Sequence, residues 1–124
     1  MGRVTNLRTA IQTALTAVHP RVYYERAPQG AAYPYLVCEL SDSQDDSPIE
    51  QFRLEVDGWD ATSDTTALEA LMDTVDTALH RKASLIALQD LGFTVFRDRR
   101  FPLPDDDPLL RRRKAIFNVR AIGG

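Results

Sequence analysis

The chain has one cysteine, two histidines and no long hydrophobic run among its 124 residues. A single thiol cannot form an internal disulfide, so Cys38, which lies in an apolar stretch, is expected to be a buried side chain in a cytosolic protein. The apolar stretches fall far short of the ~20 residues that a membrane helix requires. The N-terminus lacks the basic and then apolar pattern of a signal peptide. The sequence therefore predicts a soluble protein without disulfides or membrane spans.

Groups suited to catalysis are also scarce. His19 precedes a proline and His80 follows a predicted helix, so both are expected on the surface or at helix ends. There is no glycine-rich phosphate-binding loop, no cysteine and histidine set spaced for a metal ion, and no serine nucleophile motif. We therefore predict that the protein is not an enzyme and holds no cofactor or metal.

Glu55 and Asp57 are the one acidic pair whose spacing invites a catalytic interpretation. Two carboxylates on one face of a strand can hold a divalent cation, as in some nucleases. Arg53 and Trp59 stand beside them in the sequence. This neighbourhood favours a solvated or interface strand face over a metal site.

Charge is distributed unevenly along the chain, although the net charge is only −3. Residues 38–79 contain twelve acidic residues and one basic residue, whereas residues 80–124 contain ten Lys or Arg and five Asp. The basic tracts 97–100 and 111–114 could bind nucleic acid, lie in solvent, or contact protein. Asp98 and the acids at 105–107 interrupt them and the pI is about 5.3, so a protein–protein interface is favoured over DNA binding.

Two helices are predicted from apolar residues that recur with helical spacing. The first is expected over 6–18, with Asn6 as its N-cap and the His19–Pro20 pair at its end. The second is expected over 63–81, with Ser63 as its cap. Its acids lie toward the start and its basic residues at the end, the order that the helix dipole favours.

Strands are predicted on both sides of the second helix. The apolar run 35–40 is expected in the middle of a sheet, buried on both faces. The alternating run 51–57 is expected to have one buried and one wet face, with Phe52, Leu54 and Val56 on the buried side. Further strands are expected at 21–27, 93–101 and 114–122, charged loops at 41–48 and 102–108, and the conformation of 83–91 is left open.

The resulting order is α-β-β-β-α-β-β. Each helix has one apolar stripe, which needs a sheet face to cover it. The predicted fold is therefore α+β, with two helices packed on one face of a mostly antiparallel or mixed sheet of 4–5 strands, in a single domain over residues 1–124.

Four segments of the chain resemble a known family. They are LRTAIQTAL, RVYYERAPQGAAYPYLVCEL, FRLEVDGWDATSDTTALEALMDTVDTALH and RKAIFNVRA, and together they cover most of the sequence. The most specific parts are the entry to the central strand, from Arg21 to Tyr35, and the strand–helix unit from Phe52 to Leu79. The chain resembles the tail-completion and tail-terminator proteins of phages with long, non-contractile tails and of related prophages.

The resemblance implies a virion structural protein, made in the host cytoplasm and located at the head-proximal end of the tail. It implies a hexameric ring that caps the tail tube and contacts the tube protein and the head connector or stopper. DNA would pass through its lumen without specific binding. The alternatives are another neck component, such as an adaptor or a stopper, or a small DNA-binding accessory protein.

A ring requires two different surfaces that meet between neighbours. We expect a basic face of one subunit to contact an acidic face of the next, and the loop 41–48 to project into the lumen or toward an adjoining ring. The basic face is predicted to comprise Arg97, Arg99, Arg100, Arg111, Arg112 and Arg113. The acidic face is predicted to comprise Glu55, Asp57, Asp60, Glu69, Asp73 and Asp76, and the loop carries Asp42, Asp45 and Asp46.

Overall fold

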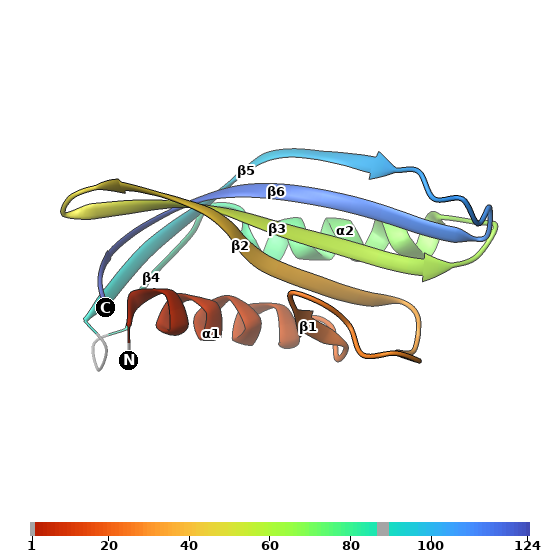
Figure 1. Ribbon diagram of the computed structural model, residues 1–124, viewed down its shortest axis with the longest axis horizontal. Coiled ribbons are helices and arrows are strands. Elements are labelled where there is room, and N and C mark those ends of the chain that lie inside the picture. The colour runs from red at the N-terminus through yellow and green to blue at the C-terminus, as the bar shows by residue number, and fades with distance from the viewer. Residues whose placement is uncertain (1, 87–89) are drawn as a thin grey trace.

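Two helices and a long, curved sheet make up the computed structural model, which describes residues 2–86 and 90–124 (Figure 1). The helices have 14 residues each, and neither is long and apolar enough to cross a membrane. In chain order the elements are α1 (Arg3–Thr16), β1 (Val22–Tyr24), β2 (Tyr35–Asp46), β3 (Ile49–Ala61), α2 (Thr66–Leu79), β4 (Lys82–Ile86), β5 (Leu91–Leu103) and β6 (Leu110–Gly123).

The sheet has the strand order β1-β2-β3-β6-β5-β4. β1 pairs with β2 in parallel, and all other neighbours are antiparallel. The α+β class and the mixed sheet are thus confirmed, but the expected count of 4–5 strands is wrong, because there are six. The additional strand is β4, in the segment 83–91 that was left open; residues 87–89 of that segment lie outside the described residues.

Both helices cover the same face of the sheet, which we call the covered face. Figure 1 shows α2 behind the strands and α1 below them. The core between the layers combines side chains of β2, β3, β5 and β6 with the apolar stripes of both helices. Leu7, Ile11 and Leu15 of α1 and Leu68, Met72 and Val75 of α2 are at most 1% exposed. Each helix thus buries its stripe against the strands, as predicted.

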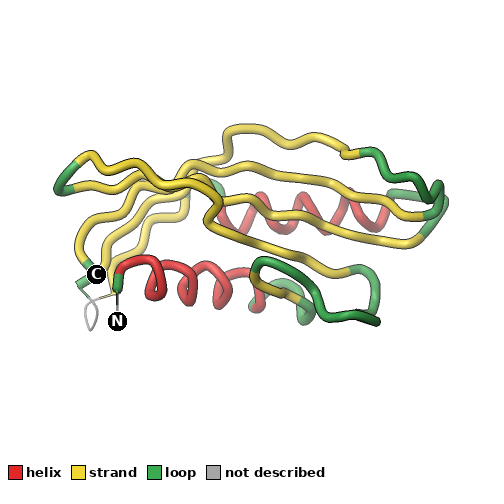
Figure 2. The backbone as a smooth tube through the Cα atoms, viewed as in Figure 1, coloured by secondary structure: helices red, strands yellow, loops and turns green. Residues whose placement is uncertain are grey.

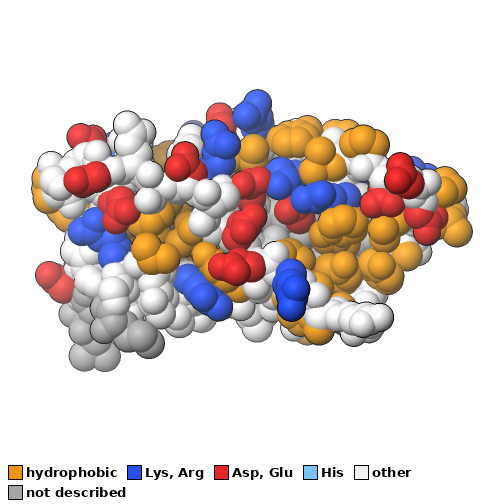
Figure 3. Space-filling view, in the orientation of Figure 1, with side chains coloured by type: hydrophobic (Ala, Val, Ile, Leu, Met, Phe, Trp, Pro, Cys, Tyr) orange, Lys and Arg blue, Asp and Glu red, His pale blue; other side chains and the backbone are white. Residues whose placement is uncertain are grey.

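The opposite face of the sheet, which we call the open face, carries no helix in the described part of the chain. Along β2, Leu36 and Cys38 are fully buried, whereas Tyr35, Val37 and Glu39 are half-buried on the open face. The prediction that 35–40 is buried on both faces is therefore wrong. Figure 3 shows hydrophobic side chains gathered on one half of the open face and acidic and basic side chains beside them. The apolar run indicated a second covering layer, and no element within residues 2–86 and 90–124 supplies one.

The helix boundaries differ from the prediction in an informative way. α1 begins at Arg3 with Gly2 as its N-cap, so Asn6 lies within the helix, and it is 6% exposed. The Asn6 amide donates a hydrogen bond of 3.4 Å to the carbonyl oxygen of Gly124. Asn6 therefore connects α1 to the C-terminal end of β6, a role that its local sequence could not reveal.

The second helix also begins later than expected. Its N-cap is Thr65 and not Ser63. The Asp64 carboxylate accepts hydrogen bonds from the backbone N–H of Thr66 at 2.9 Å and from the Thr66 hydroxyl at 2.7 Å. Such short polar side chains satisfy the free N–H groups of a first helical turn.

Of the two segments predicted as charged loops, 41–48 is largely strand, whereas 102–108 is mostly loop, as predicted. β2 continues to Asp46 and β3 begins at Ile49, so only Ser47 and Pro48 form the turn, and a bulge separates Leu40 from Asp42. Residues 41–48 are all exposed, and the hairpin projects beyond the helices (Figure 2). β5 continues to Leu103, so the second loop spans 104–109. Polar residues suggested a loop at 41–48 because a strand that is wet on both faces lacks the alternating pattern.

Candidate interaction surfaces

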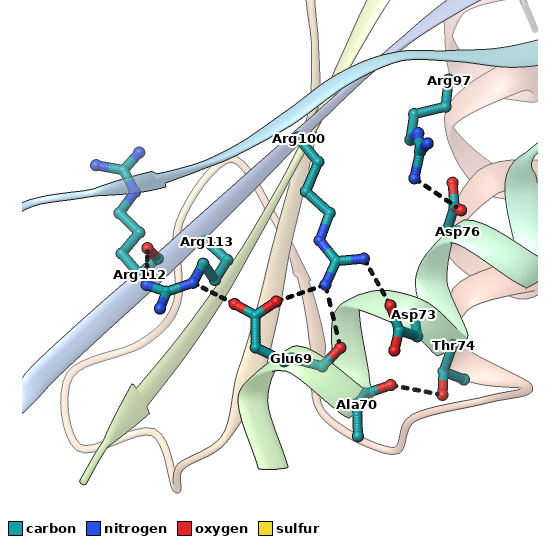
Figure 4. Close-up of polar contacts among 9 residues, drawn as sticks. All are labelled: Glu69, Ala70, Asp73, Thr74, Asp76, Arg97, Arg100, Arg112 and Arg113. Carbon is teal, nitrogen blue, oxygen red and sulfur yellow. Dashed lines mark hydrogen bonds and ion pairs between the residues drawn. The ribbon is translucent and has the colours of Figure 1, made fainter. Parts of the chain in front are cut away.

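Two groups of charged residues lie on opposite faces of the sheet. The first, which we call the ionic seam, joins α2 to β5 and β6 (Figure 4). Glu69, Asp73 and Asp76 occupy successive turns of one side of α2, as their spacing of four and three predicts. The arginines reach them from two neighbouring strands of the sheet. Arg97 and Arg100 lie in β5, and Arg113 lies in β6.

Arg100 is the centre of the seam. One of its terminal nitrogens lies 2.7 Å from an Asp73 oxygen and the other 2.7 Å from a Glu69 oxygen. Arg113 donates to the second Glu69 oxygen, and Arg97 lies 2.9 Å from Asp76. The hydrogen bond from Arg113 is the main reason that the pKa of Glu69 is lowered, and Arg100 contributes to the same shift. Burial opposes the charge of Arg100, yet its bonds to Asp73 and Glu69 raise its pKa overall.

The second charged group lies on the open face. Arg112 donates to Asp57 over 3.1 Å, and Lys114 lies 2.5 Å from Glu55 and 3.4 Å from Asp57. Hydrogen bonds from Lys114 and from Ser41 lower the pKa of Glu55. The carboxylates that could have suggested a cation site are thus neutralised by basic side chains of β6.

Most residues of the predicted basic face therefore contact residues of the predicted acidic face within one chain. Arg97, Arg100, Arg112 and Arg113 all bind acids of the predicted acidic face. A contact of these residues with a neighbouring subunit stays a prediction, and any such contact would have to share or replace the bonds inside the chain.

The remaining predicted residues have different surroundings. The Asp60 carboxylate is buried and accepts a hydrogen bond from the backbone of Ala61, and Arg111 donates to the carbonyl oxygen of Thr62. Arg99 has a 62% exposed side chain, and its nearest acid in the described residues is Asp98 at 3.9 Å. The three acids of the hairpin are Asp42, Asp45 and Asp46. They are exposed and form no ion pair with any described residue.

The open face also carries a row of stacked rings that the sequence analysis did not single out. Tyr35 and Trp59 are cross-strand partners with ring centroids 6.4 Å apart, and Tyr33 stacks on Tyr35 at 5.3 Å. The guanidinium of Arg112 lies 4.8 Å from the centroid of the Trp59 ring. A signal was present in the sequence: Tyr35 and Trp59 each lie an odd number of residues from the buried positions of their strands and therefore point away from the core.

Beside this row lies an open pocket of about 230 Å³. Val37 forms part of its lining between the rings and the charged group. Glu25, Arg26 and Ala27 line it from the segment that follows β1, and the rest of the lining comes from β2, β3 and β6, namely Tyr35, Val37, Glu39, Asp57, Trp59 and Arg112.

The two histidines and the cysteine that were considered as reactive side chains are held by backbone hydrogen bonds or buried. A ring nitrogen of His19 lies 2.9 Å from the carbonyl oxygen of Pro34, and His80 accepts a hydrogen bond of 2.9 Å from the backbone of Arg97. Burial raises the pKa of the Cys38 thiol to about 12, so it stays protonated and unreactive at neutral pH. Within residues 2–86 and 90–124, no three His, Cys, Asp or Glu side chains form a group that could hold a metal ion.

Known proteins share both the sequence pattern and the fold of this chain. Residues 5–123 match the sequence family described as "Tail completion protein gp17". A solved chain from the "Virion of native gene transfer agent (GTA) particle" has the same fold, with a TM-score of 0.75 and 18% identity over 99% of this chain and 100% of that one. A second solved chain, known only by a sequence label, has a TM-score of 0.59 and 12% identity over 99% and 97%. No curated protein sequence matches.

Proposed function

The chain belongs to the phage tail-completion protein family, whose members are structural proteins of the virion tail, and on this premise we propose that it forms a hexameric ring that caps the tail tube and joins it to the head connector. The single observation that carries the proposal is the family match over residues 5–123. The open sheet face supports it, because a half-buried aromatic face without a covering layer is typical of a protein that completes its packing in an assembly. The proposed role is structural and involves no catalysis.

The contact between subunits that was predicted from the sequence can be assigned to fewer residues. Most basic residues of the predicted face already bind acids of their own chain, whereas Arg99 has only a distant neighbour in Asp98. Asp73 has a side chain that is 73% exposed and can accept a second arginine without losing Arg100. We therefore place Arg99 of one subunit against Asp73 of the next, a heterologous contact of the kind that closes a ring.

The projecting hairpin is the second part of the proposal. In six copies, Asp42, Asp45 and Asp46 would surround either the lumen or an adjoining ring. In the lumen, these carboxylates would repel the phosphates of passing DNA, because like charges raise the energy at short range. Deleting the hairpin tip, residues 44–49, should leave the fold intact and impair the joining of heads to tails.

The ring is tested by light scattering of the purified protein at low and high salt, and by electron microscopy of the protein added to tail tubes. We expect six-fold rings, either free or at tube ends, that Arg99→Glu prevents and that Asp73→Arg restores in the double variant. Arg99→Lys, which keeps the charge, is the matched control and should assemble. Tube ends that stay bare, with the protein monomeric at every concentration and salt, would refute the proposal.

A further inference from the structure

The pocket on the open face combines aromatic rings with carboxylates that have no cationic partner in the described residues. Its lining includes three acids, Glu25, Glu39 and Asp57, and two arginines. Asp57 is neutralised by Arg112 and Lys114. Glu25 and Glu39 take part in no ion pair or side-chain hydrogen bond that links them to another described residue.

Glu39 lies next to another carboxylate and has no ion pair of its own with a described residue. In the pairing of β2 with β3 it stands directly opposite Glu55, and like charges in directly opposite positions destabilise a sheet. Lys114 binds Glu55 and Asp57, not Glu39. A half-buried carboxylate opposite another carboxylate is not expected to stabilise the fold. Its position is suited to binding a positive charge from outside the chain.

The rings that line the same pocket as Glu39 already hold one planar cation. This cation is Arg112: its guanidinium lies over the Trp59 ring while its Nε donates to Asp57. An aromatic face attracts a cation through the negative charge above its ring, and guanidinium groups both stack on rings and form paired hydrogen bonds with carboxylates. Tyr35 offers a second ring, nearly parallel to Trp59 with an interplanar angle of 20°.

We propose that this pocket binds an arginine side chain of another protein, presented in a segment whose flanking residues are apolar. The guanidinium would lie in the pocket beside the rings and donate to Glu39 and Glu25. The neighbouring rings would bury the apolar flanks, and Figure 3 shows hydrophobic side chains gathered on one half of this face. The exposed Arg26 side chain at the rim has freedom to move away from an incoming cation.

The inference does not depend on ring formation, because every residue of the pocket belongs to one subunit. A monomeric protein would therefore refute the ring and leave the arginine-binding pocket untouched. A pocket that binds charged and neutral peptides equally would refute the pocket and leave the ring untouched. The inference goes beyond the proposed function by stating the chemistry of a partner that the open face would recognise.

Trp59 is the only tryptophan in the chain, so its fluorescence reports directly on the pocket. The probes are three peptides, acetyl-Gly-Leu-X-Leu-Gly-amide, in which X is arginine, lysine or the neutral isostere citrulline. We expect a saturable change of Trp59 emission with the arginine peptide. The citrulline peptide should bind at least about tenfold more weakly, because citrulline keeps the shape of arginine but lacks its charge-assisted hydrogen bonds. Equal binding of the lysine peptide would show that charge alone, and not guanidinium stacking, is recognised, and would overturn the assignment to arginine.

Two variants separate a binding role from a structural one. Glu39→Gln should weaken binding of the arginine peptide about five- to tenfold and leave the citrulline peptide unaffected, while unfolding at the same or a higher temperature than the parent protein. Asp106→Asn removes the same charge from an exposed position outside the pocket and should change neither property. Identical affinities for arginine and citrulline peptides, or equal binding by the two variants, would overturn the proposal.

Discussion

The two faces of the sheet are built from the same strands and serve different purposes. On the covered face the side chains of β2, β3 and β6 meet both helices, and residues such as Leu36, Val56 and Phe117 are fully buried. On the open face the alternate residues of the same strands form a row of rings and a charged group, in which Tyr35, Trp59 and Lys114 are half-buried. The comparison teaches that apolar content alone does not indicate the core, because a strand can be apolar on a face that no described helix covers.

The largest difference between the faces should appear when an aromatic ring is removed from each. Phe117→Ala on the covered face should lower the free energy of unfolding by about 3–5 kcal/mol, because it leaves a cavity in a fully buried site. Phe101→Ala, at a half-buried position of β5, should cost about 1 kcal/mol or less, because solvent already reaches the site. Urea denaturation measures both, and similar losses would show that the open face is part of the core.

Gly58 marks the point where α2 comes closest to β3. A Cβ atom at this position would lie 2.7 Å from the Met72 sulfur and 3.1 Å from a Leu68 methyl carbon. Gly58→Ala should therefore destabilise the protein by about 1–3 kcal/mol, the usual cost of overpacking. Gly2→Ala, where a Cβ would meet nothing within 4 Å, is the steric control; because Gly2 is the N-cap of α1 and alanine caps less well than glycine, a loss of up to about 1 kcal/mol there would reflect capping and not packing. A neutral Gly58→Ala would mean that α2 does not pack this closely.

The ionic seam makes the stability of the covered side depend on pH. The pKa of Glu69 is lowered in the folded protein, so its contribution is present above the glutamate pKa of the unfolded chain, about 4.3, and is lost as pH falls through the lower folded value. Glu69→Gln should cost about 1 kcal/mol at pH 7, since the carboxylate is partly exposed, and less at pH 3. Denaturation at the two pH values tests this, and an equal cost at both would contradict an ionic role.

The smallest expected effect on stability comes from a test that compares the solvent accessibility of positions 37 and 38, which are adjacent in β2. Cys38 faces the core, and its thiol, with a pKa of about 12, should resist iodoacetamide in the native protein at pH 8. A second thiol introduced by Val37→Cys on the open face should be alkylated, with a change in stability of about 1 kcal/mol or less. Mass spectrometry counts the labelled sites. Labelling of Cys38 without denaturant would show that β2 opens or that its faces are assigned the wrong way round.

Patterns along the chain predicted the covered face well, because burial against helices leaves a periodic signature. Phe52, Leu54 and Val56 are buried as expected, and so are Phe117 and Val119. The same reasoning failed where that signature is absent. The wet hairpin strands were taken for a loop, and β4 lay in a segment without clear alternation.

The candidate surfaces were predictable in composition but not in arrangement. Sequence analysis identified the acidic and basic residues and expected them to meet between subunits. The structure shows Arg113 bound to Glu69, 44 residues away, and Lys114 bound to Glu55, 59 residues away. Such pairs depend on which strands become neighbours, and no local pattern encodes that choice.

What the sequence by itself determined is therefore the α+β class, the two amphipathic helices, the buried side of the main strands and the family. Each of these depends on local periodicity or on residues that follow one another along the chain. Only the tertiary structure decided that β6 lies between β3 and β5, that the charged residues meet within one subunit, and that Tyr35, Trp59 and Glu39 share a pocket. These follow from the register of strands distant in sequence, which is set by the packing of the whole core and not by any one segment.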